Sequence, residues 1–171
     1  MPLGGARRGR MPMIAQAAAA LLALAVPSAA FAASWTAYGN ARFGYLVDLP
    51  PGFPPIREAD NGDGGVSAST EGHAALSVWG SYLLDSTFRQ EAGSRIAGDA
   101  EKGWSIGYRA VTARAASWSG SKGDRILYVR AIARCRDQAA FMRIEYDASA
   151  KAVYDPIVSR LVKSLRASGG C

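Results

Sequence analysis

The sequence predicts an α+β domain in which an antiparallel β-sheet is flanked by helices. Several short segments alternate apolar and polar residues and come in hairpin-like pairs. One helical stripe lies between these pairs and a second one closes the chain. The 171 residues are 49% hydrophobic and 20% charged, which is typical of a globular protein, and no internal repeat or long linker interrupts residues 33–171. We therefore expect this part of the chain to form a single domain.

Residues 1–32 have the three zones of a cleavable secretory signal peptide. Three arginines form a basic start, residues 13–26 form an uncharged apolar run, and Ala30-Phe31-Ala32 places small residues before the expected cleavage site. The apolar run is shorter than the roughly 20 residues that a membrane-spanning helix needs. We predict cleavage near Ala32, no membrane span after signal cleavage, and a periplasmic or secreted product.

The basic charge of the chain is unevenly distributed. The formal net charge is +6, but residues 1–32 hold three arginines and no acidic residue. The remaining residues carry 17 basic and 14 acidic side chains, so the exported product is only slightly basic. We therefore expect no nucleic-acid partner.

The sequence predicts four strands in the first half of the exported chain, and the last two of them are expected to form a hairpin. Ala74, Leu76 and Val78 alternate with more polar neighbours, which indicates one buried face. The turn between the hairpin strands is expected at Glu71-Gly72. The predicted strands are Trp35–Tyr38, Tyr45–Leu49, Val66–Thr70 and Ala74–Tyr82.

A helix is predicted after this hairpin. Asp85 or Ser86 is expected to cap it, and Gly103 to end it. The expected apolar stripe consists of residues four apart: Phe88, Ala92, Ile96 and Ala100.

The second half predicts four more strands and a closing helix. A turn is expected over Ser119–Gly123, and the helix over Ser149–Ala167 with Pro156 either kinking it or marking its first turn. The predicted strands are Ile106–Val111, Ala113–Trp118, Arg125–Arg134 and Ala139–Asp147.

Two segments carry a resemblance to a known family. Residues 43–50, Phe-Gly-Tyr-Leu-Val-Asp-Leu-Pro, resemble the first hairpin of PsbP-like domains, and residues 161–165 are similar to the end of that group's closing helix. The resemblance implies an α/β/α sandwich built on an antiparallel sheet. It also implies a domain that binds and assists other proteins, and it carries no universal set of catalytic residues.

The two cysteines, Cys135 and Cys171, both lie in the exported part of the chain. An even cysteine count in an oxidising compartment favours a disulfide, which would tie the C-terminal tail to the body of the domain. The alternative is a free thiol on an exposed turn and a frayed terminus.

Arginines on the strongest hairpin form the main candidate for a binding surface. With a four-residue loop over Cys135–Gln138, Arg130 faces Arg143 and Tyr128 faces Glu145 on one side of the sheet. Two opposed arginines are tolerated if Glu145 neutralises one of them, or if the pair binds a carboxylate or phosphate. Arg109 and Arg114 are candidates to extend this patch.

The acidic turn and the single histidine are weaker candidates for chemistry. Asp60 and Asp63, together with Glu58, offer oxygen ligands for a cation, but the EF-hand spacing places Ala59 and Thr70 at two key ligand positions. A turn is the simpler interpretation, so no metal site is assigned. His73 is expected on an exposed turn, and no Gly-x-Ser-x-Gly motif accompanies it.

These observations favour an exported, non-enzymatic binding or accessory domain of the bacterial cell envelope. Its expected partner is another envelope protein or an acidic small ligand, and no cofactor is expected. The alternative is a small periplasmic hydrolase with an unidentified site that uses Asp60, Asp63 or His73. A third interpretation is a protein with a purely structural role.

Overall fold

The computed structural model describes residues 34–171, so the predicted signal peptide and its cleavage site lie outside the described residues. Within this range, strands and helices follow the predicted α+β order. The N-terminal half contains β1 (Thr36–Asn40), β2 (Tyr45–Leu49), β3 (Arg57–Glu58), β4 (Gly64–Ala68), β5 (Ala74–Tyr82) and α1 (Phe88–Glu101). The C-terminal half contains β6 (Ser105–Val111), β7 (Ala115–Lys122), β8 (Arg125–Arg134), β9 (Gln138–Asp147), a short 3₁₀ helix (Ala148–Ala150), α2 (Lys151–Ser164) and β10 (Arg166–Ala167).

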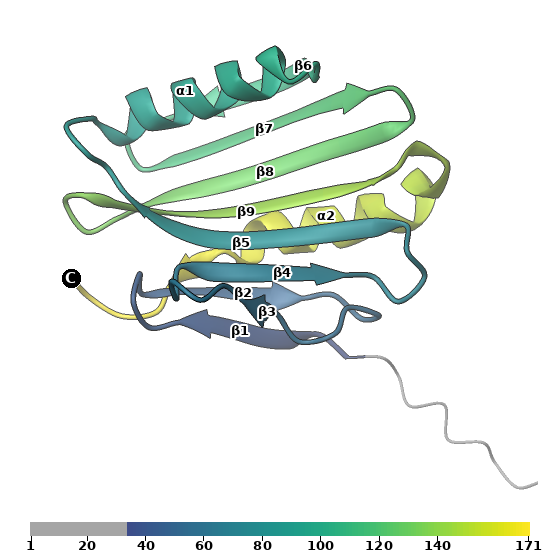
Figure 1. Cartoon of the computed structure of the whole chain (residues 1–171), viewed down its shortest axis with the longest axis horizontal. Helices are drawn as coiled ribbons and strands as arrows, with labels where there is room; N and C mark the ends of the chain where they lie inside the picture. The colour runs from purple at the N-terminus through teal and green to yellow at the C-terminus, as the bar shows by residue number, and fades with distance from the viewer. Residues whose placement is uncertain (1–33) are drawn as a thin grey trace, which may run out of the picture. The chain divides into compact units, whose positions relative to one another are not determined.

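Seven strands form one antiparallel sheet in the order β3-β4-β5-β9-β8-β7-β6 (Figure 1). The hairpins β4–β5, β6–β7 and β8–β9 supply most neighbours, and β5 pairs with β9 to join the two halves of the chain. A second sheet has the order β1-β2-β10, so the last strand of the chain pairs with the second one.

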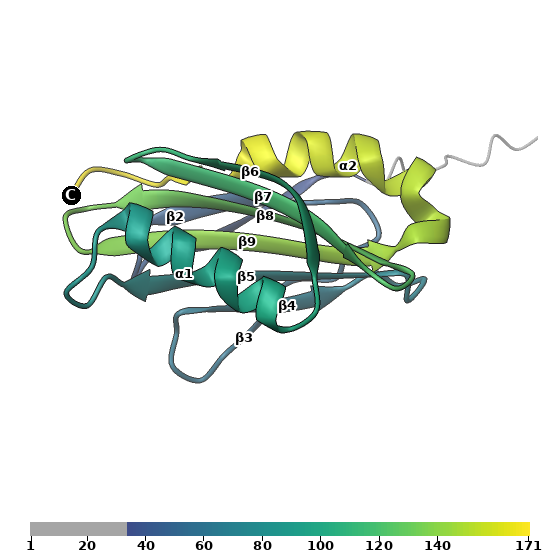
Figure 2. The same cartoon turned by 90° about the horizontal axis from the view of Figure 1, so that it is seen from above.

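The two helices lie on opposite faces of the large sheet (Figure 2). On one face, α1 packs through Phe88 and Ile96 onto a buried cluster that includes Leu127, Val129 and Phe141. On the other face, α2 and the small sheet share a second cluster, which includes Tyr45, Val47, Met142, Ile144 and Leu161. Helices on both faces of an antiparallel sheet are the α/β/α arrangement that the sequence resemblance implied. Neither helix is long and apolar enough to cross a membrane.

The start of α1 differs from the prediction. Thr87 is the N-cap: its hydroxyl accepts a hydrogen bond from the Gln90 backbone N–H at 3.3 Å, and its own N–H donates to the Gln90 side chain at 2.8 Å. This reciprocal capping box requires a residue such as glutamine three positions after the cap. Asp85 and Ser86 lack one, so the prediction that either caps the helix is wrong.

The buried stripe of α1 also differs at its end. Phe88, Ala92 and Ile96 are buried as predicted, but Ala100 is exposed and Asp99 is buried in its place, with a relative exposure of 4%. A buried carboxylate requires compensating partners. It therefore marks a polar contact between α1 and the sheet.

Two other element ends are corrected by the structure. Strand β7 continues through the predicted turn to Lys122, because every residue from Ala115 to Lys122 pairs with β8. The closing helix ends at Ser164, and Arg166 and Ala167 pair with β2 instead of extending it. Pro156 lies inside α2, beyond its first turn.

Candidate functional site: one arginine on each face of the sheet

The β8–β9 hairpin has a different register from the predicted one. Its loop has three residues, so Arg134 pairs with Gln138, and Arg130 lies opposite Met142 instead of Arg143. A shift of one residue moves every side chain of one strand to the other face of the sheet. Arg130 and Tyr128 therefore lie on the α2 face, whereas Arg143 and Glu145 lie on the α1 face. The predicted four-residue constellation is wrong as a single surface, and the structure divides it into two sites.

On the α1 face, Arg143 is neutralised by two carboxylates. Its Nη1 lies 2.7 Å from Asp99 Oδ1, and its Nε lies 2.7 Å from Glu145 Oε1. Asp99 also accepts a hydrogen bond from the Trp118 indole N–H at 2.7 Å. The ion pair with Arg143 and the hydrogen bond from Trp118 compensate the buried charge of Asp99, and they hold α1 against the sheet.

A pocket of about 590 Å³ lies beside this network, between α1 and the sheet. Arg95 lines it, pairs with Glu91 at 2.7 Å, and places its guanidinium 4.3 Å from the centre of the Phe141 ring. Arg143, the other arginine in the wall, is paired with Asp99 as well. Both arginines of this pocket thus have an acidic partner from the chain itself.

On the α2 face, Arg130 has no such partner. Its Nη1 donates to the Ser117 hydroxyl at 3.0 Å, and no carboxylate of residues 34–171 lies within ion-pair distance of its guanidinium. Its Nε is buried and has no hydrogen-bond partner in the structure. Buried donors in proteins are almost always satisfied by protein or by ordered water, so this Nε can donate to a water or to a ligand oxygen.

A pocket of about 360 Å³ lies next to Arg130, between α2 and strands β6 to β8. Ser117, the partner of Arg130, lies in its wall together with Tyr108 and Tyr128. Val158 and Val162 of α2 make the opposite wall apolar. An arginine beside such a pocket can recognise a planar carboxylate whose carbon chain lies against the valines and tyrosines.

Asp155, at the α2 side of this pocket, is compensated within the chain. It pairs with Lys151, whose ammonium holds the pKa of the carboxyl below its usual value, and it accepts a hydrogen bond from the Tyr146 hydroxyl at 3.1 Å. Burial, with Asp155 as the hydrogen-bond acceptor, raises the pKa of Tyr146 and keeps its hydroxyl protonated. The Asp155 carboxylate is therefore already bound by Lys151 and Tyr146 of the same chain.

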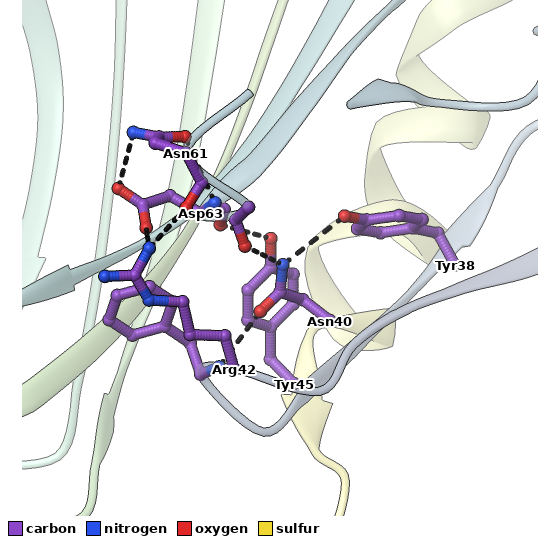
Figure 3. Close-up of polar contacts among 8 residues, drawn as sticks. Tyr38, Asn40, Arg42, Tyr45, Asn61 and Asp63 are labelled. Atoms are coloured by element: carbon purple, nitrogen blue, oxygen red, sulfur yellow. Dashed lines mark hydrogen bonds and ion pairs between the residues drawn. The ribbon is translucent and has the colours of Figure 1, made fainter. Parts of the chain in front are cut away.

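The acidic turn after β3 is a structural contact (Figure 3). Asp63 pairs with Arg42 at 2.8 Å, and its backbone carbonyl accepts a hydrogen bond from the Tyr45 hydroxyl at 3.1 Å. Burial raises the pKa of Tyr45, so this hydroxyl stays a donor. Asn40 donates to the Gly62 carbonyl at 2.9 Å, which fixes the turn against β1 and β2. Residues 34–171 contain no group of three potential metal ligands, and Asp60 is exposed.

His73 belongs to an ion-pair cluster at the end of the sheet. Its Nδ1 lies 2.9 Å from Asp147 Oδ2, and Arg125 lies 2.6 Å from Asp147 Oδ1. Hydrogen bonds from His73 and Arg125 hold the pKa of Asp147 below its usual value. Among residues 34–171, the His73 ring forms its hydrogen bond with the Asp147 carboxylate.

The predicted disulfide between Cys135 and Cys171 is confirmed. The two Cα atoms lie 5.3 Å apart, and the bond ties the β8–β9 turn to the C-terminal tail. Arg134 supports the same contact by donating to the Gly169 carbonyl at 3.2 Å. Arg114 and Arg136 flank the disulfide in a shallow depression of about 510 Å³.

Seven arginines form no ion pair with a carboxylate of residues 34–171, and they lie on several parts of the domain. Arg89 and Arg109 line a pocket between α1 and β6, Arg130 lies on the α2 face, and the others are Arg57 on β3 and, around the disulfide, Arg114, Arg134 and Arg136. The sequence had indicated Arg109, Arg114 and Arg130. It gave no signal for Arg89, which lines the same pocket as Arg109 only because α1 packs beside β6.

Comparison with known proteins identifies the fold alone. The sequence matches no protein-family model and no curated protein. Among solved structures, the chain is similar to cyanobacterial PsbP (CyanoP) from Synechocystis sp. PCC 6803, with a TM-score of 0.57 and 14% sequence identity. The match covers 84% of this chain and 98% of CyanoP. The chain therefore has a PsbP-like fold, as residues 43–50 and the closing helix had indicated.

Proposed function

We propose that this chain is an exported, non-enzymatic accessory domain of the cell envelope that binds a partner through a carboxylate. The single observation that carries the proposal is the unpaired state of the Arg130 guanidinium. This arginine has an unsatisfied buried Nε, lacks an acidic partner among residues 34–171, and lies beside an apolar pocket. A guanidinium in this state binds a carboxylate without first breaking an ion pair of the protein.

The site favours a carboxylate attached to an apolar chain. Ser117 lies in the wall of the pocket and holds the Arg130 guanidinium next to it, whereas Val158 and Val162 supply apolar surface. Arg109 on β6 and Arg114 in the turn after it add positive charge near this end of the sheet, which attracts acidic partners.

A titration with hexanoate tests the site directly. We expect hexanoate to shift the backbone amide resonances of β7, β8 and α2 in the disulfide-bonded exported protein, and hexanamide of the same shape to bind at least about tenfold more weakly. Arg130→Gln should abolish the hexanoate shifts, and Arg130→Lys should retain only part of the affinity because lysine lacks the planar pair of donors. Arg57→Gln, an exposed arginine on β3 at the opposite margin of the sheet, is the matched control.

A second titration separates two sources of the carboxylate. A short neutral peptide that contains one glutamate presents the group as a protein side chain, whereas hexanoate presents it as a free acid. Dependence on Arg130 with either probe supports the proposal. Equal binding of hexanoate and hexanamide, or shifts that persist in Arg130→Gln with both probes, would overturn it.

Export has its own test. The apolar run and small residues of the N-terminus together with the Cys135–Cys171 disulfide support an oxidising compartment. We expect periplasmic or secreted protein to begin at Ala33 and to carry no free thiol, as measured by intact mass with and without thiol alkylation. Protein that retains Met1 and stays in the cytosol would contradict this part of the proposal.

A further inference from the structure

The two margins of the large sheet differ in how they are covered. One margin is β3, which has only two residues and is contacted by β1 through a hydrogen bond from Tyr38 to Glu58 at 2.9 Å. The other margin is β6, which has seven residues. No strand or loop of residues 34–171 forms backbone hydrogen bonds with the outer side of β6. A long unpaired edge is a template for an additional strand.

A groove of about 720 Å³ follows this edge, between β6 and α1. Its helix side includes Gly93 and its strand side includes Gly107, and a side chain added at either glycine would meet no atom within 4 Å. The groove is therefore open beside these two glycines, where another chain would approach β6. An added strand lies roughly 5 Å from its neighbour, so it would run along the groove beside α1.

The charged residues of the groove determine which added strand would bind there. Arg89 from α1 and Arg109 from β6 lie in its wall, both are exposed, and neither has an acidic partner among residues 34–171. No acidic residue lines the groove. Arg114 lies in the turn between β6 and β7 and extends the positive surface toward the disulfide. An acidic segment matches these charges, whereas a second copy of β6 would bring like charges together.

The opposite side of β6 faces the Arg130 pocket. Tyr108 is 54% exposed and lines both the groove and this pocket. Because side chains alternate along a strand, every second residue of an added strand would lie toward Arg89 and Arg109, and the residues between them would lie toward Tyr108. The edge thus fits a sequence in which acidic and apolar residues alternate.

We propose that β6 binds an extended, acidic segment of a partner protein as an added strand. The acidic character of the partner rests on the proposed function, whereas the place and the extended conformation come from the open edge itself. Arg89 and Arg109 disfavour a basic strand, because like charges on neighbouring strands repel. A strand with acidic side chains supplies the missing partners for the arginines.

The test uses a synthetic peptide of alternating glutamate and valine with blocked ends. We expect it to bind the exported protein, as measured by fluorescence anisotropy, and to slow amide hydrogen exchange in β6 and β7. Arg109→Glu should weaken binding at least about tenfold, as should replacement of the glutamates by lysine. Arg57→Glu at the β3 margin should bind as the unaltered protein does.

Backbone pairing is tested by two further peptides, one N-methylated at the valines and the other at the glutamates. Only one of the two sets of N–H groups can point toward β6, so we expect one peptide to lose binding and the other to keep it. Equal affinity of the two methylated peptides, or unchanged hydrogen exchange in β6, would overturn the proposal. If hexanoate still binds through Arg130 in that case, only the strand docking is wrong; if hexanoate also fails, the proposed function fails with it.

Discussion

The two faces of the sheet each hold one half-buried arginine, and the two arginines have opposite surroundings. Arg143 contacts two carboxylates at 2.7 Å each, one of them almost completely buried. Arg130 contacts one hydroxyl and keeps a buried donor without a partner. The difference separates structure from recognition: a guanidinium that the chain neutralises itself holds the fold together, whereas one that it leaves unmatched is available to a ligand.

The layers that cover the two faces are also held in different ways. Asp99 on α1 is bonded to Arg143 and Trp118, so α1 is fastened to the sheet by a buried polar network. On the other face, the tail after α2 is fastened by the Cys135–Cys171 disulfide and by the pairing of β10 with β2. Substitutions in the two layers should therefore have separable effects.

The largest effect is expected for Asp99→Ala. The substitution removes one carboxylate from Arg143 and leaves the buried Trp118 N–H without an acceptor, and breaking a buried ion pair from one side costs about 4 kcal/mol. The free energy of unfolding in urea measures the loss. As a control, Asp99→Asn should lose less stability than Asp99→Ala, because an amide oxygen can still accept the hydrogen bond of the Trp118 indole. A loss below about 1 kcal/mol for Asp99→Ala would show that the network does not fasten α1.

A somewhat smaller loss is expected for Cys171→Ser. The disulfide closes a loop with a sequence separation of 36 residues, for which the chain-entropy model gives roughly 3.8 kcal/mol. Hydrogen exchange should increase in β10 and β2 more than in α1, because the bond holds the tail and not the helix. The same protein under reducing conditions should lose a similar amount of stability. Faster exchange in α1 than in β10 would contradict the assignment of the two layers.

A much smaller effect on stability is expected for Arg130→Met. The substitution removes an unsatisfied buried donor and breaks a single hydrogen bond to Ser117, so the free energy of unfolding should change by no more than about 0.5 kcal/mol. Arg143→Met is the matched comparison and should be clearly destabilising, because it leaves Asp99 buried without its cation. Similar losses for the two variants would mean that Arg130 has a structural role after all.

The order and type of the elements were largely predictable from the sequence, because alternation and helical spacing are local properties. The hairpins β4–β5 and β8–β9 and the buried positions of β5 followed from them. The register of β8–β9 did not, since it depends on whether the loop has three or four residues. Cys135 takes a positive φ of 46°, which nothing in a cysteine indicates, and this conformation accompanies the shorter loop.

The two arginine sites were predictable only in part for the same reason. The sequence identified the right candidate residues, namely Arg130, Tyr128, Arg143 and Glu145. The predicted register was wrong by one residue, and it therefore placed all four on one face of the sheet. Asp99 gave no signal, because a four-residue spacing selects Ala100 and the helix instead turns its neighbour toward Trp118 and Arg143. One pattern would have indicated the buried Asp99: a carboxylate next to an expected apolar stripe, together with an arginine elsewhere in the chain that lacks a partner.

The smallest effect is expected from acid titration of exposed carboxylates, in contrast to the buried Asp99. Asp147 is hydrogen-bonded to His73 and Arg125, which lowers its pKa below the usual 3.8. The pKa of Asp155 is lowered in the same way by its hydrogen bond with Lys151. A carboxyl with a lowered pKa in the folded state stabilises the protein above pH 3.8, and this contribution is lost as the pH falls through the folded-state value. We expect the melting temperature to decrease below that pH, and Asp147→Asn to make the decrease shallower. An equally steep decrease in Asp147→Asn would show that the ion pairs of Asp147 do not cause the acid sensitivity.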